Sequence, residues 1–163
     1  MITNIHVRDL HASLPVVGAI LDGLASKQDL LWPYEKWPPM LLDRPLGIGA
    51  IGGHSATRYI VESYKPGQYI SFRFTAPKGL IGNHCFSIKE IKPDVVQIKH
   101  EVNMNLEGFA KIWWLIRIRY VHDAIIEDAF DKAESYVTHR PLNRKWSIWV
   151  RFLRWIMSRK KKK

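Results

Sequence analysis

The chain is poor in cysteine. Its 163 residues include a single one, Cys85, which excludes an intrachain disulfide and every CxxC zinc or redox motif. Because free thiols persist in reducing compartments, we expect a cytoplasmic protein. The N-terminal stretch 1–8 also lacks the basic segment and hydrophobic run of a secretory signal, so we expect no export. With 47% hydrophobic residues, one domain can bury a core without metal or disulfide staples.

Long hydrophobic runs are missing as well. The most hydrophobic piece is 112–116, and Arg117 ends it. A helix that crosses a bilayer needs about 20 such residues. Any membrane contact is therefore expected at the bilayer surface.

Several enzyme motifs are absent too. The sequence has no nucleophile elbow, no HExxH zinc motif and no P-loop. The segment Gly47–Gly52 matches GxGxxG, which binds a dinucleotide only between a strand and a helix. Here Pro45 precedes the motif and a predicted strand follows it, so we interpret it as a flexible or tightly turned loop. We expect no cofactor, and no metal, because no three candidate ligands show the spacing of a zinc site.

Acidic residues are absent from the last 25 positions, His139–Lys163, which hold 10 Lys and Arg. The preceding residues balance 15 basic side chains against 15 acidic ones, so the net charge of +10 lies entirely on this segment. Three of the seven tryptophans lie there too. A basic surface coincides with an aromatic one, which favours an anionic partner that either stacks or has an apolar layer behind it.

As a helix over Arg144–Ser158, this tail would be amphipathic and about 22 Å long. Such a helix is typical of a membrane interface, with Trp at headgroup depth and basic side chains toward anionic lipid. The predicted membrane contacts are Trp146, Trp149, Arg151, Phe152, Leu153, Arg154, Trp155, Ile156, Lys160 and Lys161. Alternatively, the hydrophobic face docks on the domain, as amphipathic helices commonly do. Nucleic acid is the least favoured partner, because the neutral remainder of the chain offers no matching basic patch.

Period-two alternation predicts an antiparallel sheet in the middle of the chain. The expected strands cover 57–64, 68–75, 81–90 and 94–104, with turn sequences between them. A short strand through Ile5 and Val7 and a helix starting near Ser13 precede them. The segment 43–55, which holds four glycines, is expected to be rich in turns.

Helical spacing predicts one long helix over 108–137. Its hydrophobic stripe is first Phe109, Ile112, Trp113, Ile116 and Tyr120, and then Ile125, Ile126, Ala129, Phe130 and Ala133. At about 100° per residue the two sets are out of phase, which predicts a kink, a break or a change of burial partner around 117–121. The carboxylates Asp123, Glu127 and Asp131 follow one another at i,i+4, and we interpret them as an ion-pair row that meets Arg58 or Arg44.

This element order indicates an α+β protein with the helix-grip fold. A curved antiparallel sheet wraps around a long C-terminal helix, and a basic amphipathic tail helix follows. We divide the chain into a helix-grip domain at 1–137, a linker at 138–143 that contains Pro141, and the tail at 144–163.

Four segments resemble bacterial members of the SRPBCC superfamily, which is related to START domains and includes polyketide-cyclase-like proteins. They are Leu42–Leu46, Gly52–His54, Arg58–Tyr59 and, above all, His122–Ala129. The resemblance covers about 1–137 and implies a hydrophobic cavity between sheet and helix. Arg119–Tyr120 departs from the Arg-Pro of the superfamily pattern, so a softer kink is expected there.

The inner face of the predicted sheet supplies the candidate ligand contacts. Together with the first half of the long helix, they are Phe72, Phe74, His84, Phe86, Ile98, His100, Val102, Trp113, Ile116 and Tyr120. The same residues equally suit a filled core, and only the resemblance favours a cavity. His84 and His100 are the candidate acid/base pair, with hydrogen-bonded core histidines as the alternative interpretation.

The leading functional hypothesis is binding of a hydrophobic small molecule or lipid in the cavity, near the cytoplasmic membrane surface. The alternative is a cyclase, dehydratase or hydrolase that acts on an aromatic or polyketide-like substrate through His84 or His100.

Overall fold

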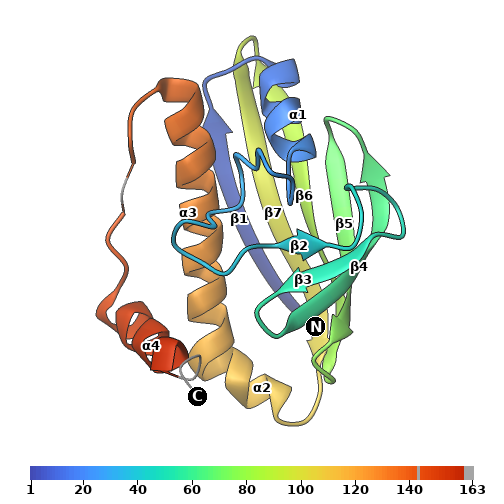
Figure 1. The fold of residues 1–163 in the computed structure, drawn as a ribbon, viewed down its shortest axis with the longest axis vertical. Coiled ribbons are helices and arrows are strands. Elements are labelled where there is room, and N and C mark those ends of the chain that lie inside the picture. The colour runs from blue at the N-terminus through green and yellow to red at the C-terminus, as the bar shows by residue number, and fades with distance from the viewer. Residues whose placement is uncertain (143, 160–163) are drawn as a thin grey trace.

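The central element is a curved antiparallel sheet (Figure 1). The computed structural model describes residues 1–142 and 144–159, within which seven strands pair in the order β1-β7-β6-β5-β4-β3-β2. The strands are β1 Ile2–Leu10, β2 Leu41–Leu42, β3 Ile51–His54, β4 Thr57–Lys65, β5 Tyr69–Ala76, β6 Leu80–Lys92 and β7 Val95–Leu106. The four predicted central strands are confirmed, with ends that differ by at most two residues.

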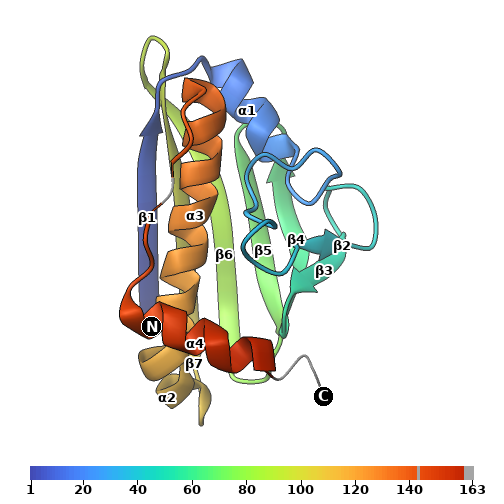
Figure 2. The same ribbon diagram turned by 60° about the vertical axis from the view of Figure 1, so that its left-hand side comes forward.

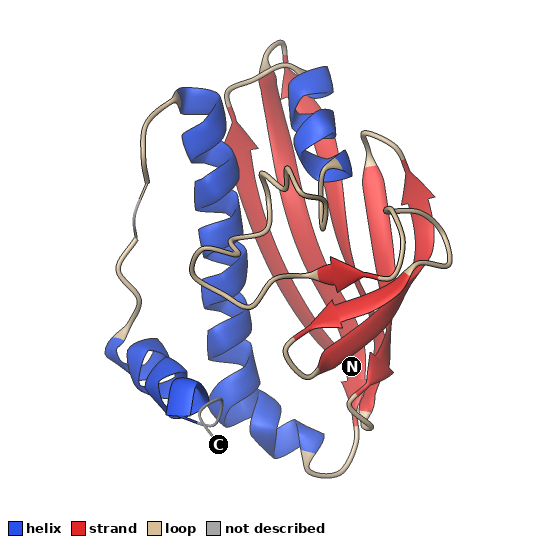
Figure 3. Ribbon diagram, in the orientation of Figure 1, coloured by secondary structure: helices blue, strands red, loops and turns tan. Residues whose placement is uncertain are grey.

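The helical elements lie against the concave face and at one end of the sheet (Figure 3). They are α1 Leu14–Asp22, α2 Ala110–Trp113, the π-helix η1 Trp114–Ile118, α3 Arg119–Thr138 and α4 Ile148–Arg159. Helix α3 runs along the sheet, and α4 crosses near the end where α2 lies (Figure 2). The predicted α+β helix-grip arrangement is confirmed.

Strand register explains which side chains face α3. Phe72 pairs with His84, His84 with Val102, and Phe86 with His100. Directly opposed residues of antiparallel strands share a face. These side chains are all buried, so the predicted inner face of the sheet is confirmed.

The predicted change of phase in the long helix is a π-helical turn. In η1 the backbone bonds run from i to i+5, which adds a residue to the turn and rotates the helix beyond it. After this turn, Ile125, Ala129 and Phe130 pack on the core, whereas before it Phe109 and Ile112 face solvent. Within the first stripe only Trp113 lines the space between helix and sheet, so the two halves differ in burial partner. The change itself is confirmed, a few residues before the predicted position.

The GxGxxG segment has a structural explanation. Strand β3 follows it, so no helix N-terminus receives a phosphate there. A Cβ atom on Gly52 would lie 1.9 Å from the carbonyl oxygen of Leu41. Only glycine therefore allows β2 to pair with β3, which shapes the loop that precedes the site.

The carboxylates of α3 tie the helix to β1. Arg8 of β1 donates to Glu127 at 2.8 Å, to Asp131 at 3.0 Å and also to Glu134. The predicted ion-pair row exists, but its partners are not the predicted ones. Arg44 pairs with Asp43, and Arg58 donates to the backbone carbonyls of Ser55 and Thr57. Strand β1 reaches α3 because it pairs with β7 at the sheet edge beside the helix.

The tail docks on the domain through a buried aspartate of α3. Asp128 accepts hydrogen bonds from Trp37 at 2.7 Å, from Trp146 at 2.8 Å and from Lys36 at 2.7 Å. The Arg154 guanidinium of α4 lies 3.8 Å from the ring centroid of Trp146 and 4.5 Å from that of Trp37. Asp128 thus joins the segment after α1, the long helix and the tail.

Candidate functional site

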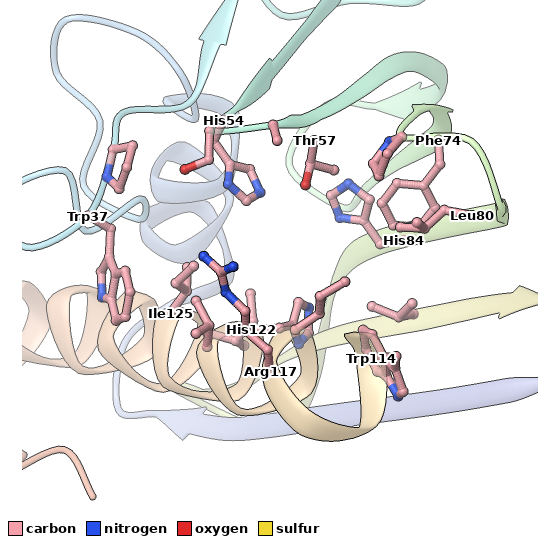
Figure 4. A pocket seen from close by; sticks show the side chains of 18 of the residues that line it. Trp37, His54, Thr57, Phe74, Leu80, His84, Trp114, Arg117, His122 and Ile125 are labelled. Atoms are coloured by element: carbon pink, nitrogen blue, oxygen red, sulfur yellow. The ribbon is translucent and has the colours of Figure 1, made fainter. Parts of the chain in front are cut away.

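A cavity of about 320 Å³ lies between the sheet and the long helix (Figure 4). Its wall comes from β3 to β7 and the turns between them, η1, α3, the segment after α1, and one residue each of α2 and α4. The lining residues are Trp32, Trp37, Pro38, His54, Ser55, Ala56, Thr57, Phe74, Pro77, Leu80, His84, His100, Val102, Met104, Trp113, Trp114, Arg117, Ile118, Val121, His122, Ile125, Ile126 and Met157. This volume suits a small, largely hydrophobic ligand.

Histidines supply most of the polarity of the wall. His84 and His100 come from the paired strands β6 and β7, and their Nδ1 and Nε2 atoms are 3.3 Å apart. The ring of His122 on α3 is 5.1 Å from that of His100, centroid to centroid. His54 enters from β3 and points into the same space as His84 (Figure 4).

These histidines are uncharged at neutral pH. Burial lowers the pKa of His54 to about 4. Burial, with repulsion from the neighbouring rings, holds the pKa of His84 and His100 well below the usual value of 6.5. The pKa of His122 is lowered as well, mainly by burial, although Asp123 partly offsets that effect. A neutral imidazole offers one donor and one acceptor, so the wall can bind either a hydroxyl or a carbonyl.

Several buried polar atoms of this region have no hydrogen-bond partner among the described residues. They are His84 Nε2, His100 Nδ1, both ring nitrogens of His122 and the Tyr59 hydroxyl. His122 Nδ1 lies 3.6 Å from Asp123, beyond hydrogen-bond distance. Buried polar groups are rarely left unsatisfied. Because His84, His100 and His122 line the cavity and Tyr59 does not, the histidine nitrogens are the candidates for contact with the polar end of a ligand.

Arg117 brings a permanent charge to the cavity. Its side chain rises from η1 into the space between helix and strands (Figure 4). Within residues 1–142 and 144–159, no carboxylate lies within ion-pair distance of its guanidinium, which instead lies 5.9 Å from the Trp113 ring centroid. An anionic group on a ligand could pair with it.

Beside the cavity lies a group that could hold a metal ion. Ligand atoms of His6, His122 and Asp123 lie within 4.8 Å of one another. Both ring nitrogens of His6 are already engaged, at 2.8 Å from Glu127 and 3.1 Å from Asp123. Burial opposes the charged ring, but these hydrogen bonds outweigh it and raise the pKa of His6. A protonated imidazole is an ion-pair partner and cannot be a ligand, so the arrangement fits an ion-pair cluster better.

The structure divides the predicted ligand contacts. Phe74, His84, His100, Val102 and Trp113 line the cavity. Five do not: Phe72, Phe86 and Ile98 are covered within the core, and Ile116 and Tyr120 point outward on the helix. The core residues lie within the main hydrophobic cluster, which also contains side chains of α1 and α3. The helix residues lie on the side that η1 turns away.

Sequence reasoning missed His54, Arg117 and His122 as cavity residues. A signal existed for His122, which precedes Ile125 and Ile126 by three and four positions and so shares their helix face. The phase change at η1 hid Arg117. His54 lies in a segment expected to be turns, and only β-pairing with β4 directs it inward.

The predicted membrane contacts of the tail fall into three groups. Trp149, Arg151, Phe152 and Trp155 are exposed, and Ile156 is partly buried. Trp146, Leu153 and Arg154 contact the domain instead, because they lie on the face that packs near Asp128. Lys160 and Lys161 lie outside the described residues. Within the described part of the chain, no helix combines the length and hydrophobicity needed to cross a membrane.

Comparison with known proteins supports the fold. No protein-family model and no curated protein matches the sequence. An NMR structure from Thermobifida fusca matches 90% of this chain and 100% of its own, with a TM-score of 0.65 and 8% identity. CalU16 from Micromonospora echinospora matches 93% of this chain and 80% of its own, with a TM-score of 0.61 and 10% identity. A norcoclaurine synthase mutant from Thalictrum flavum, bound to a transition-state analogue, matches 85% of this chain and 96% of its own. The TM-score is 0.63 and the identity 13%. At such identities the shared property is the fold.

Proposed function

We propose that this protein binds a hydrophobic small molecule or lipid in the cavity between the sheet and the long helix. The observation that carries the proposal is the cavity of about 320 Å³, whose wall is mainly apolar and includes neutral histidines and Arg117 among its few polar residues. Ligand pockets commonly combine an apolar wall with a few converging polar groups. CalU16 and norcoclaurine synthase share the fold, and they fit the SRPBCC superfamily, to which we assign the chain.

The polar groups define the kind of ligand. Arg117 would pair with a carboxylate or another anionic group, while the free ring nitrogens of His84 and His122 would bind a hydroxyl or carbonyl. We therefore propose a hydrophobic ligand with one anionic or strongly polar end.

Two variants of the helix test the cavity. Ile118→Trp places a large side chain in the cavity wall, and Leu115→Trp adds the same side chain at an exposed position of η1. Native mass spectrometry should find a hydrophobic molecule bound to the wild type and to Leu115→Trp but not to Ile118→Trp. A molecule that remains bound to folded Ile118→Trp at wild-type occupancy would contradict the proposal.

Arg117→Gln tests the anionic end. Binding of dodecanoate should weaken about tenfold or more, since hydrogen bonds to charged groups contribute about 1.5–3 kcal/mol, whereas binding of dodecanol should not change. Arg119→Gln is the matched control, because Arg119 is exposed and does not line the cavity. Equal losses for acid and alcohol would show that Arg117 does not recognise the charge.

A second candidate function is acid/base catalysis on an aromatic or polyketide-like substrate. It is favoured by one observation, the contact of two neutral imidazoles, His84 and His100, each with a free nitrogen beside the cavity. Replacing both with Gln should abolish cyclase, dehydratase or hydrolase turnover without unfolding the domain. Unchanged turnover in the folded double variant would eliminate the enzyme hypothesis. The cytoplasmic location stays a prediction.

A further inference from the structure

One end of the molecule exposes large hydrophobic side chains on two neighbouring helical segments. Phe109, Ile112 and Leu115, on and just before α2 and η1, are 80%, 55% and 62% exposed. Ile148 and Phe152 of α4 are 84% and 46% exposed. The indole of Trp149 joins the two segments by donating to the carbonyl of Ile116 at 3.1 Å. We call this surface the α2–α4 face (Figure 2).

The segments that form the α2–α4 face are basic, although the exposed Glu107 directly precedes the first of them. Residues 108–122 contain Lys111, Arg117 and Arg119 and no acid, and the last 25 residues contain no acid either. Among these cations, Lys111 and Arg151 are exposed, next to the hydrophobic side chains in sequence. Hydrophobic and Trp side chains bordered by Lys and Arg form the pattern of a protein surface at an anionic bilayer.

The face also borders the opening of the cavity. Trp113, half exposed, and Arg117 belong to the α2–η1 segment and line the cavity, and Met157 of α4 lines it as well. The exposed lining residues Ser55 and Ala56 join His54 to Thr57, which lie across the cavity from Arg117 (Figure 4). The same helices thus form part of the cavity rim and part of the outer surface.

We propose that the α2–α4 face docks on an anionic lipid bilayer and presents the cavity opening to it. The docking proposal rests on the proposed function, and it implies that the hydrophobic ligand passes between cavity and bilayer without crossing water. The tail contacts the bilayer through the side of α4 that does not dock on the domain, and α2 and η1 also contact it. The two predicted positions of the tail, on the domain and on the membrane, are therefore compatible.

Charge and side-chain type favour a bilayer over the other possible occupants. In a symmetric dimer each face would meet a copy of itself, and two surfaces with a net positive charge would repel each other. A nucleic acid would use stacking on aromatic rings, but Ile112, Leu115 and Ile148 are aliphatic and cannot stack. An anionic bilayer offers acyl chains to the hydrophobic side chains and negatively charged headgroups to the cations.

Vesicle binding of the full chain tests the proposal. The wild type should sediment with vesicles of phosphatidylcholine and phosphatidylglycerol, less with phosphatidylcholine alone, and less at higher salt. The triple variant Phe109→Ser, Ile112→Ser, Leu115→Ser should bind at least about tenfold more weakly, because these side chains would leave the bilayer. The matched control carries Val16→Ser, Ile48→Ser and Ile91→Ser, which are also exposed but lie outside the face, and should bind as the wild type does.

Three results would overturn the proposal: vesicle binding of the triple variant equal to that of the wild type, a dimer that the triple variant abolishes without any vesicle binding, or RNA binding in place of vesicle binding. Dodecanoate binding measured without vesicles separates this proposal from the cavity function. If the triple variant no longer binds vesicles but still binds dodecanoate, both proposals hold. If the wild type binds vesicles but no dodecanoate, only the cavity function fails.

Discussion

The two halves of the long helical stretch carry similar hydrophobic side chains and place them in opposite environments. Phe109 is 80% exposed before the π-helix, whereas Phe130 is fully buried after it. The residue that η1 adds turns one stripe toward the sheet and the other toward solvent. Hydrophobicity along a helix therefore predicts that a face will be covered, but not whether the protein's own core covers it.

The largest expected effect on stability comes from a substitution in the buried half of the helical stretch. Phe130→Ala should lower the free energy of unfolding by about 3–5 kcal/mol, because it leaves a cavity in the core. Phe109→Ala should change it by less than about 0.5 kcal/mol. Urea unfolding of both variants checks this contrast, which similar losses would contradict.

The next largest effect concerns Asp128, which holds the tail on the buried half. Asp128→Ala should cost about 3 kcal/mol, because it leaves Trp37, Trp146 and Lys36 without their buried acceptor. It should also expose the tail to proteases. Glu107→Ala, at an exposed position before α2, is the control for both urea unfolding and limited proteolysis. A loss below about 1 kcal/mol would show that the tail is held elsewhere.

A smaller effect, of up to about 1.4 kcal/mol per pH unit, concerns His122 at the start of the buried half. Its folded-state pKa is lowered, mainly by burial, so below pH 6.5 the unfolded chain binds a proton that the folded one does not. The stability that it contributes is complete above pH 6.5 and is lost as the pH falls. His6, whose pKa is raised, acts in the opposite direction.

The comparison of variants isolates this contribution. Stability of the wild type and His122→Gln, measured by urea unfolding between pH 7 and pH 5, should show a shallower decrease for the variant. His11→Gln, at an exposed position, should keep the wild-type slope. Parallel curves for His122→Gln and the wild type would show that the ring is not held neutral.

The smallest expected effect on stability is that of a substitution in the exposed half of the helical stretch. Leu115→Ser should change the free energy of unfolding by less than about 0.5 kcal/mol, because the side chain is 62% exposed. It should nevertheless weaken vesicle binding. A loss of more than about 1 kcal/mol in stability would mean that the α2–α4 face is covered by the protein itself.

Much of the sheet could be predicted from the sequence, because strand alternation is a local pattern. The turns after Tyr64, Ala76 and Lys92 fixed where strands end, and alternation correctly placed Phe72, His84 and His100 on the inner face. The depth of each side chain could not be predicted in the same way. Phe72 and Phe86 share the inner face with Phe74, yet only Phe74 reaches the cavity, because the other two are enclosed in the main hydrophobic cluster.

The sequence by itself determined the strand pattern, the long helix with its change of phase, and the concentration of net charge at the end of the chain. These properties depend on spacing and composition, which are readable along the chain. Only the tertiary structure decided that His54 and His122 join His84 and His100 at the cavity, that Asp128 holds the tail, and that Phe109, Ile112 and Leu115 face outward. Each depends on how distant segments approach one another, and that is set by packing around α3.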